Sequence, residues 1–234
     1  MTRKLIQIFI VLLSVGAPAL ARTSGMNLTA LGDYSYTTAY GHSAGLDLVA
    51  GIPVGPRFDC QPALQLTTAG VHTVALQTRS IFPSGKNIFY LKNRMAFKDI
   101  ARSGIYDVCL GLSLGWARDH FDLEAGMFGR TMDGFGRDIH TTDAPMCEPF
   151  NLIYSIKGMI LKADSPWNIW GSFSNVDLFQ FERMWQPIVA VGGWYDITER
   201  LTIRLETFCK PTGMFHGNAE FYSICARAGV TLKF

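Results

Sequence analysis

Charged side chains are scarce in this chain, and long apolar runs are scarcer still. Asp, Glu, Lys and Arg make up 17% of its 234 residues, whereas an average soluble domain has roughly 25%. After residue 21, no stretch approaches the ~20 consecutive apolar residues of a membrane-spanning helix, which excludes a helical membrane protein. Membrane-spanning strands are still compatible with the sequence, because their signature is an alternation of apolar and polar residues and not a run.

Cysteine patterns that hold a metal ion are also missing. The five cysteines are Cys60, Cys109, Cys147, Cys209 and Cys225, and no two of them form a C-x-x-C pair. Their spacings match no zinc site, so we expect no metal and no cofactor. An odd number leaves at least one thiol free in an oxidising compartment. Small residues packed in a wall or lumen are the simplest interpretation.

The first 21 residues have the three parts of a cleaved signal peptide. Arg3 and Lys4 precede an apolar core over 5–13, and an A-x-A cleavage site follows at 19–21. The core is too short for a membrane-spanning helix, so we expect export and a single mature domain over 22–234. Removing residues 1–21 lowers the basic residues from 21 to 19, equal to the 19 acidic residues. This balance provides no basic field for nucleic acid.

The last sixteen residues alternate in polarity. Even positions from Tyr222 to Phe234 are apolar, and odd positions from Ser223 to Lys233 are small or polar. A period of two predicts a strand, because successive side chains point to opposite faces. An apolar strand that ends on an aromatic residue suits a sheet that closes on itself in lipid, where an open edge is not tolerated.

This end of the chain carries a recognisable motif, Arg227-x-Gly229-x-x-Leu232-x-Phe234. It resembles the C-terminal assembly signal of Gram-negative outer-membrane β-barrels. The resemblance implies insertion into the bacterial outer membrane by the barrel-assembly machinery, with outer-membrane lipid around the barrel. The signal indicates a location and a fold, and it does not indicate an activity.

About twelve segments show the same alternation, which predicts an all-β, antiparallel, up-and-down transmembrane β-barrel. Tight turns and long loops alternate between them, which predicts that both termini and the short turns lie in the periplasm. A soluble β-sandwich or lipocalin-like barrel is the alternative, but charges in mid-strand and the terminal aromatic favour lipid. The expected strands are 27–37, 43–54, 58–67, 71–82, 88–97, 105–117, 121–130, 150–161, 167–175, 188–195, 201–209 and 219–234.

If the apolar faces point to lipid, six acids and six bases point into the lumen. Burying a charge is costly unless it is paired or hydrated, so we expect either a salt-bridged interior or a narrow hydrated channel. These charges could serve the wall alone or also select solutes. The lumen-lining charges are Asp33, Asp47, Lys92, Arg94, Asp107, Asp122, Glu124, Arg130, Lys157, Arg204, Glu206 and Arg227. The expected neighbours of opposite sign are Arg94 and Asp107, Glu124 and Lys157, and Arg227 and Asp33.

Residues 111–115 match the G-x-S-x-G pattern of serine hydrolases, with Ser113 at the nucleophile position. A nucleophile elbow needs a sharp turn from strand to helix, but this pentapeptide lies inside the most regular predicted strand. We therefore expect no catalytic residue here and interpret Ser113 as a small residue of the inner face.

A loop with several aromatic residues, Met and Arg precedes the tenth predicted strand. Such a composition resembles an interaction surface for a surface protein. The alternatives are a loop that folds inward as a plug and a strand end in the aromatic girdle. The residues concerned are Phe179, Phe181, Arg183 and Trp185.

These observations favour a barrel without enzymatic activity, either a narrow ion-paired channel for small solutes or a structural or docking component. The alternative is an outer-membrane lipid hydrolase or lipid A-modifying enzyme, which needs a His in contact with a Ser or carboxylate at the outer rim. The expected rim residues are His42, Ser43, His72, His140 and His216.

Overall fold

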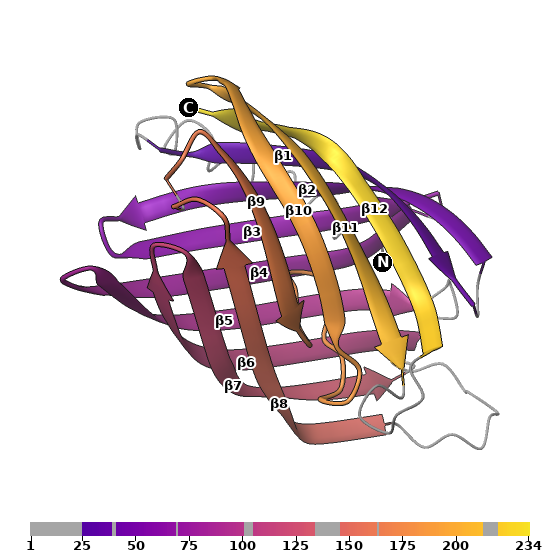
Figure 1. Ribbon diagram of the computed structural model, residues 1–234. Helices are drawn as coiled ribbons and strands as arrows, with labels where there is room; N and C mark the ends of the chain where they lie inside the picture. Colours follow the sequence, from indigo (N-terminus) through magenta and orange to yellow (C-terminus); the bar gives the residue numbers. More distant parts are fainter. Residues whose placement is uncertain are drawn as a thin grey trace.

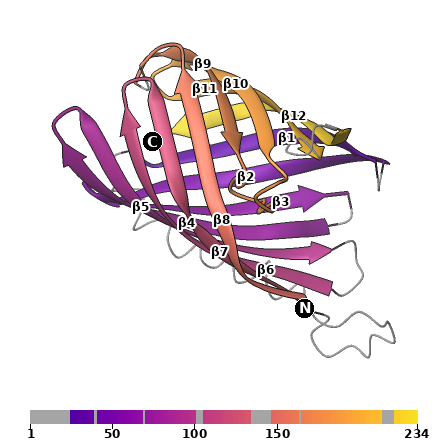
Figure 2. The ribbon, with the colours of Figure 1, turned by 60° about the horizontal axis from the view of Figure 1, so that its bottom comes forward.

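The computed structural model describes residues 25–38, 41–68, 70–100, 105–133, 146–162, 164–212 and 220–234. In these segments, twelve antiparallel strands form one closed barrel in which each strand pairs with its neighbours in the chain (Figure 1). Figure 2 shows the strands running obliquely around the barrel. The strands are β1 (Asn27–Thr37), β2 (Gly41–Gly55), β3 (Phe58–Thr67), β4 (Gly70–Ser84), β5 (Asn87–Ile100), β6 (Ile105–Arg118), β7 (Phe121–Asp133), β8 (Met146–Met159), β9 (Trp167–Ser174), β10 (Ile188–Thr198), β11 (Leu201–Thr212) and β12 (Glu220–Lys233).

The last strand closes the barrel against the first, as the alternation at the C-terminus predicted. β1 and β12 pair without interruption from Asn27 opposite Lys233 to Thr37 opposite Ser223. Beyond this ladder, the amide of Phe234 donates to the carbonyl of Met26 at 2.8 Å. The predicted up-and-down antiparallel fold is therefore confirmed, and no strand edge is left open between β1 and β12.

The two faces of the wall differ as the alternation requires. Large apolar side chains on the outside are widely exposed, among them Leu114 at 68% and Phe150 at 80%. Polar side chains on the inside are buried, with Asp47 and Thr73 both at 0%. A continuous exposed apolar surface around a polar interior is the arrangement of a barrel that stands in lipid. Among the described residues, no helix is long and apolar enough to cross a membrane.

The predicted strand positions are confirmed, with differences at their ends. β7 continues to Asp133 and β5 to Ile100, beyond the predicted 121–130 and 88–97. Strand pairing continues to these residues, opposite Tyr106 and Ile105 of β6, although the alternation of polarity ends earlier. β8 lies earlier than the predicted 150–161 and ends at Met159. Just beyond it, the backbone of Leu161 is hydrogen-bonded to the side chain of Asn168. The amide of Leu161 donates to Asn168 Oδ1 at 3.0 Å, and Asn168 Nδ2 donates to the carbonyl of Leu161 at 2.9 Å.

Short turns join β2 to β3, β4 to β5, β6 to β7 and β10 to β11 at the end of the barrel where the chain finishes (Figure 1). Gly85 has a φ of 61° in the turn from β4 to β5, a conformation that favours glycine. The connection from β9 to β10 begins at the opposite end, where Ser174 pairs with Ile188. This connection does not stay at the rim, and its inward path shapes the lumen.

Candidate functional site

The connection between β9 and β10 forms a small hairpin, residues 176–182, which we call the plug hairpin. Val176 and Phe181 form an antiparallel bridge, and the amide of Asp177 donates to the carbonyl of Gln180 at 2.9 Å. The Asp177 carboxylate also accepts hydrogen bonds from the amides of Phe179 and Gln180, both at 2.7 Å. An Asp side chain that closes its own turn in this way is a local signal for a tight loop.

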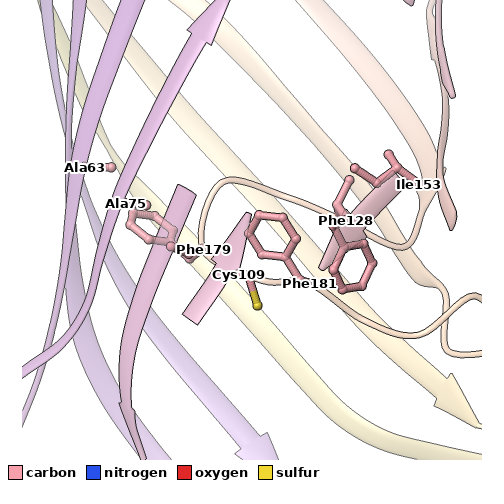
Figure 3. Close-up of a cluster of buried hydrophobic side chains, with 9 residues drawn as sticks. Ala63, Ala75, Cys109, Phe128, Ile153, Phe179 and Phe181 are labelled. Carbon is pink, nitrogen blue, oxygen red and sulfur yellow. The ribbon is translucent and has the colours of Figure 1, made fainter. Parts of the chain in front are cut away.

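The tip of the plug hairpin fills the barrel with two aromatic rings. Phe179 and Phe181 are 3% and 4% exposed and point from the hairpin into a cluster of inward-facing side chains (Figure 3). The rings of Phe181 and Phe128 meet edge to face, with centroids 5.3 Å apart. The small wall residues leave room for the rings. The buried wall residues of the cluster are Ala63, Ala75, Ala96, Cys109, Phe128 and Ile153.

From the sequence, Phe179 and Phe181 could belong either to an interaction surface or to a loop that folds inward. Their rings are buried and not available to a partner, so these two residues form an inward-folded plug. Met184 and Trp185, just after the plug hairpin, stay 44% and 46% exposed. The guanidinium of Arg183 lies 5.6 Å from the centroid of the Trp185 ring.

Three ion pairs tie the plug hairpin to the wall. Asp177 lies 3.7 Å from Arg227 of β12, and Glu182 lies 2.5 Å from Lys210 of β11. Arg183, at the base of the hairpin, pairs with Glu148 of β8. The hairpin is thus attached to β8 on one side and to β11 and β12 on the other.

A buried amide fixes the base of the plug hairpin. The side chain of Asn175, which is fully buried, donates to the carbonyls of Leu152 at 2.6 Å and Glu182 at 3.0 Å. It also accepts from the amide of Tyr154 at 2.9 Å. β9 ends at this point while β8 continues, so the backbone of β8 has no strand partner on this side. The hydrogen bonds to Asn175 take the place of the strand pairing, and these backbone groups keep their partners although the chain turns inward.

Arg227 is the centre of the first group of charges inside the barrel. Its guanidinium lies 2.9 Å from Asp47 and 2.9 Å from Glu206, in addition to Asp177 of the plug hairpin. The ring of Phe208 lies 4.7 Å from the guanidinium. Arg suits this position and Lys does not, because the planar guanidinium can bind carboxylates and stack on an aromatic ring at the same time.

A second group of charges joins β5, β6 and β7. Arg94 pairs with both oxygens of Glu124, and Lys92 binds the same carboxylate at 2.7 Å. The hydroxyl of Ser113 donates to Glu124 at 2.6 Å. Ser113 of β6 therefore faces inward and is hydrogen-bonded to an ion-pair network between β5 and β7, which agrees with its interpretation as an inner-face residue.

Asp107 and Arg130 form a separate two-point ion pair, with bonds of 2.9 and 2.7 Å. The predicted pairing of Arg94 with Asp107 is wrong. Arg94 stands opposite Gly111, four residues along β6 from Asp107. The register between strands decides which charges meet, and polarity patterns do not reveal the register.

Of the other two predicted pairs, Glu124 with Lys157 is replaced, whereas Asp33 and Arg227 are neighbours as predicted but form no direct ion pair in the described residues. Glu124 binds Lys92 and Arg94 instead of Lys157. Asp33 stands opposite Arg227 in the register, yet the guanidinium turns to Asp47 and Glu206. Within the described part of the chain, the Oδ1 atom of Asp33 is buried without a hydrogen-bond partner.

A polar cavity of about 590 Å³ lies at the short-turn end of the lumen. The remaining predicted lumen charges, Asp122, Lys157 and Arg204, line it together with Glu206. Two indole rings, those of Trp170 and Trp194, belong to the same lining. The volume of this cavity is within the range of small-molecule sites.

Five of the charges that tie the plug hairpin to the wall were absent from the predicted set. Lys210 continues the inner face of β11 in step with Arg204 and Glu206, so a longer predicted strand would have included it. The others lie in the plug hairpin, beside it or near a strand end, where no alternation marks the inner face. The residues concerned are Glu148, Asp177, Glu182, Arg183 and Lys210.

Two of the rim histidines, His42 and His72, lie among the described residues, and each contacts a hydroxyl group. His42 contacts the hydroxyl of Tyr34 at 2.8 Å, and Ser43 contacts Ser35 at 2.6 Å on the other face of β2. His72 lies 2.8 Å from the hydroxyl of Thr73. His140 and His216 lie outside the described residues. No group of His, Cys, Asp and Glu in the described segments could hold a metal ion.

No protein-family model and no curated protein matches this chain, but solved structures do. The NanC porin superposes with a TM-score of 0.57 at 12% identity, covering 88% of this chain and 100% of that one. The KdgM porin in complex with disordered oligogalacturonate gives 0.55 at 9%, covering 89% and 99%. The translocator domain of the autotransporter NalP from Neisseria meningitidis gives 0.53 at 8%, covering 100% and 97%.

These similarities define the class of the protein by its fold. The chain is a twelve-stranded β-barrel of the outer-membrane type, as the resemblance of its C-terminal motif implied. Porins and a translocator domain share this architecture, so the fold supports a place in the bacterial outer membrane. Function has to be argued from the lumen.

Proposed function

We propose that the protein is a narrow outer-membrane channel for small polar solutes, with a lumen that the plug hairpin constricts. The main observation is a closed barrel with an apolar outside and an inside that holds a polar cavity of about 590 Å³. A wall that served only as a scaffold would gain nothing from such a cavity, since burying charge beside it is costly. The similarity to the NanC and KdgM porins is consistent with this proposal.

Conductance in planar lipid bilayers tests the channel. We expect discrete current steps from the purified full chain, of small size because aromatic rings stand in the lumen. Folding is checked independently by the change in gel mobility that a closed barrel shows on heating. Folded protein that gives no current above background would refute the proposal.

We further propose that the chain termini and short turns face the periplasm, as in barrels delivered by the assembly machinery. The short turns on one end and longer connections on the other support this orientation. An epitope inserted in the connection between β7 and β8 should be accessible to antibody on intact cells. An epitope at Gly85 should become accessible only after permeabilisation, and the opposite pattern would reverse the orientation.

A docking role is a second candidate, and it now rests on Met184 and Trp185. Both are exposed large side chains beside the buried plug hairpin, and exposed aromatics are favoured in interfaces. If a surface protein binds there, Trp185→Ala should abolish its co-purification from outer membranes. Unchanged co-purification would remove this candidate and leave the channel proposal intact.

A further inference from the structure

The cavity at the short-turn end is lined by two cations that form no ion pair with a carboxylate of the described residues. Lys157 of β8 and Arg204 of β11 both line it. Within the described segments, neither forms an ion pair. Lys157 stands opposite Asp122 in the register, yet its ammonium lies over the Trp170 ring, 4.2 Å from the centroid.

The acids of the cavity are largely engaged by other groups. Glu206 binds Arg227 at 2.9 Å, and Asp196 binds Lys233 at 2.9 Å. Asp122 accepts a hydrogen bond from the hydroxyl of Tyr90. The acid that remains, Asp164, is exposed in the turn between β8 and β9. Two cations therefore face the cavity with their hydrogen-bonding capacity largely unused.

The wall is shaped to hold these groups around an open space. Gly192 of β10 allows the Trp170 ring to lie close to the wall, because a Cβ there would stand 2.6 Å from the ring. Trp194 is anchored by a hydrogen bond of 3.3 Å from its indole nitrogen to the carbonyl of Ser165. The volume of about 590 Å³ falls within the ~300–1,000 Å³ of small-molecule sites.

We propose that Lys157 and Arg204 form a binding subsite for a small hydroxylated carboxylate, a molecule of the size and chemistry of a sugar acid. The guanidinium fork of Arg204 matches a carboxylate, and the ammonium of Lys157 adds a second point charge. The engaged carboxylates Asp196 and Glu206 still have acceptor capacity for solute hydroxyls, and the buried Thr202 hydroxyl donates to Asp196 and holds it in place. This inference rests on the proposed channel function and specifies its solute class.

Isothermal titration of the folded, detergent-solubilised full chain tests the subsite. Three probes share a similar body and differ in charge: gluconate, glucose and glucosamine. We expect gluconate to bind at least about tenfold more tightly than glucose, as one charge-assisted hydrogen bond implies. Glucosamine should not bind more tightly than glucose, because like charges repel it.

Variants separate the subsite from general effects on the barrel. Lys157→Gln and Arg204→Gln together should remove the preference for gluconate. Arg204→Lys keeps the charge but loses the fork, and it should weaken gluconate binding partially. Arg118→Gln, at an exposed position on the same end of the barrel, is the matched control and should change nothing.

The outcomes distinguish this inference from the channel proposal, because binding in detergent does not require conductance. Protein that conducts but binds gluconate and glucose equally, or neither, overturns the subsite alone. Protein that binds gluconate selectively but never conducts overturns the channel and leaves a binding barrel. A preference for glucosamine would overturn the assignment of charge.

Discussion

At the scale of single residues, the motif at the C-terminus has physical roles in the barrel itself. Arg227 is the hub of the buried ion pairs with Asp47 and Glu206. Gly229 lies in β12 directly against the backbone of β1, and a Cβ there would overlap the carbonyl oxygen of Ala30. The same residues that resemble a targeting signal therefore also form the seam at which the barrel closes.

Replacing Gly229 with Ala is expected to impair closure of the barrel. The added methyl group would also lie 2.8 Å from the Cα of Leu31, so the backbone of β1 would have to move. Overpacking of this kind costs about 1–3 kcal/mol. Urea unfolding in lipid vesicles measures the loss. Gly158→Ala is the matched control, since nothing lies within 4 Å of a Cβ at that position; equal effects of the two changes would contradict the argument.

At the scale of elements, the plug hairpin is the feature that sets the width of the lumen. Its Phe181 ring reaches the level of Gly111, midway along β6, where a Cβ would stand 3.2 Å from that ring. Small side chains at Ala63, Ala75 and Ala96 receive the rings from the opposite wall. The hairpin is thus fitted to the wall by shape at its tip and by charge at its base.

Replacing Phe179 and Phe181 with Ala should release the plug hairpin and widen the lumen. Each buried Phe→Ala change costs about 3–5 kcal/mol. This loss weakens the attachment of the hairpin to the wall and not the barrel itself, because the pairing of the twelve strands does not depend on these rings. We expect larger single-channel currents in planar bilayers. Trp185→Ala, an exposed neighbour, should leave the current steps unchanged. Steps of wild-type size in the double variant would show that the hairpin does not constrict the pathway.

At the scale of the whole molecule, the polarity of the wall is reversed relative to a soluble protein. Apolar side chains such as Leu112 and Met127 are about half exposed, and the charges are turned inward. This inversion is stable only if hydrocarbon covers the outside. The barrel and its lipid surroundings therefore form one folding unit.

Leu112→Arg tests which solvent the outer face meets. Leu112 lies midway along β6 and is 48% exposed, so in a bilayer its replacement by Arg should cost about 2–4 kcal/mol. In a soluble barrel, the same exposed position would accept Arg with little effect. Leu28→Arg, near the start of β1, should cost only about 0–1 kcal/mol because it lies close to the interface. Unfolding free energies of both variants in lipid vesicles decide the question, and equal small effects would refute the lipid-facing assignment.

The sequence alone determined the strands, their inner and outer faces and the closure of β12 onto β1. Each of these follows from a period of two, which is a local property: the alternation from Ile105 to Arg118 can be read without knowing any other strand. It also indicated which charges point inward, since face follows from parity. Glu206 and Lys210 share one parity and both lie inside.

Only the tertiary structure decided which of these charges meet and what fills the lumen. Arg94 binds Glu124 because strand register brings β5, β6 and β7 into a particular alignment, and a shift of two residues would keep every face while changing every partner. The path of the plug hairpin depends on pockets that distant strands build together, from Ala63 to Ile153. Register and loop docking are long-range properties of the closed barrel, and no local pattern contains them.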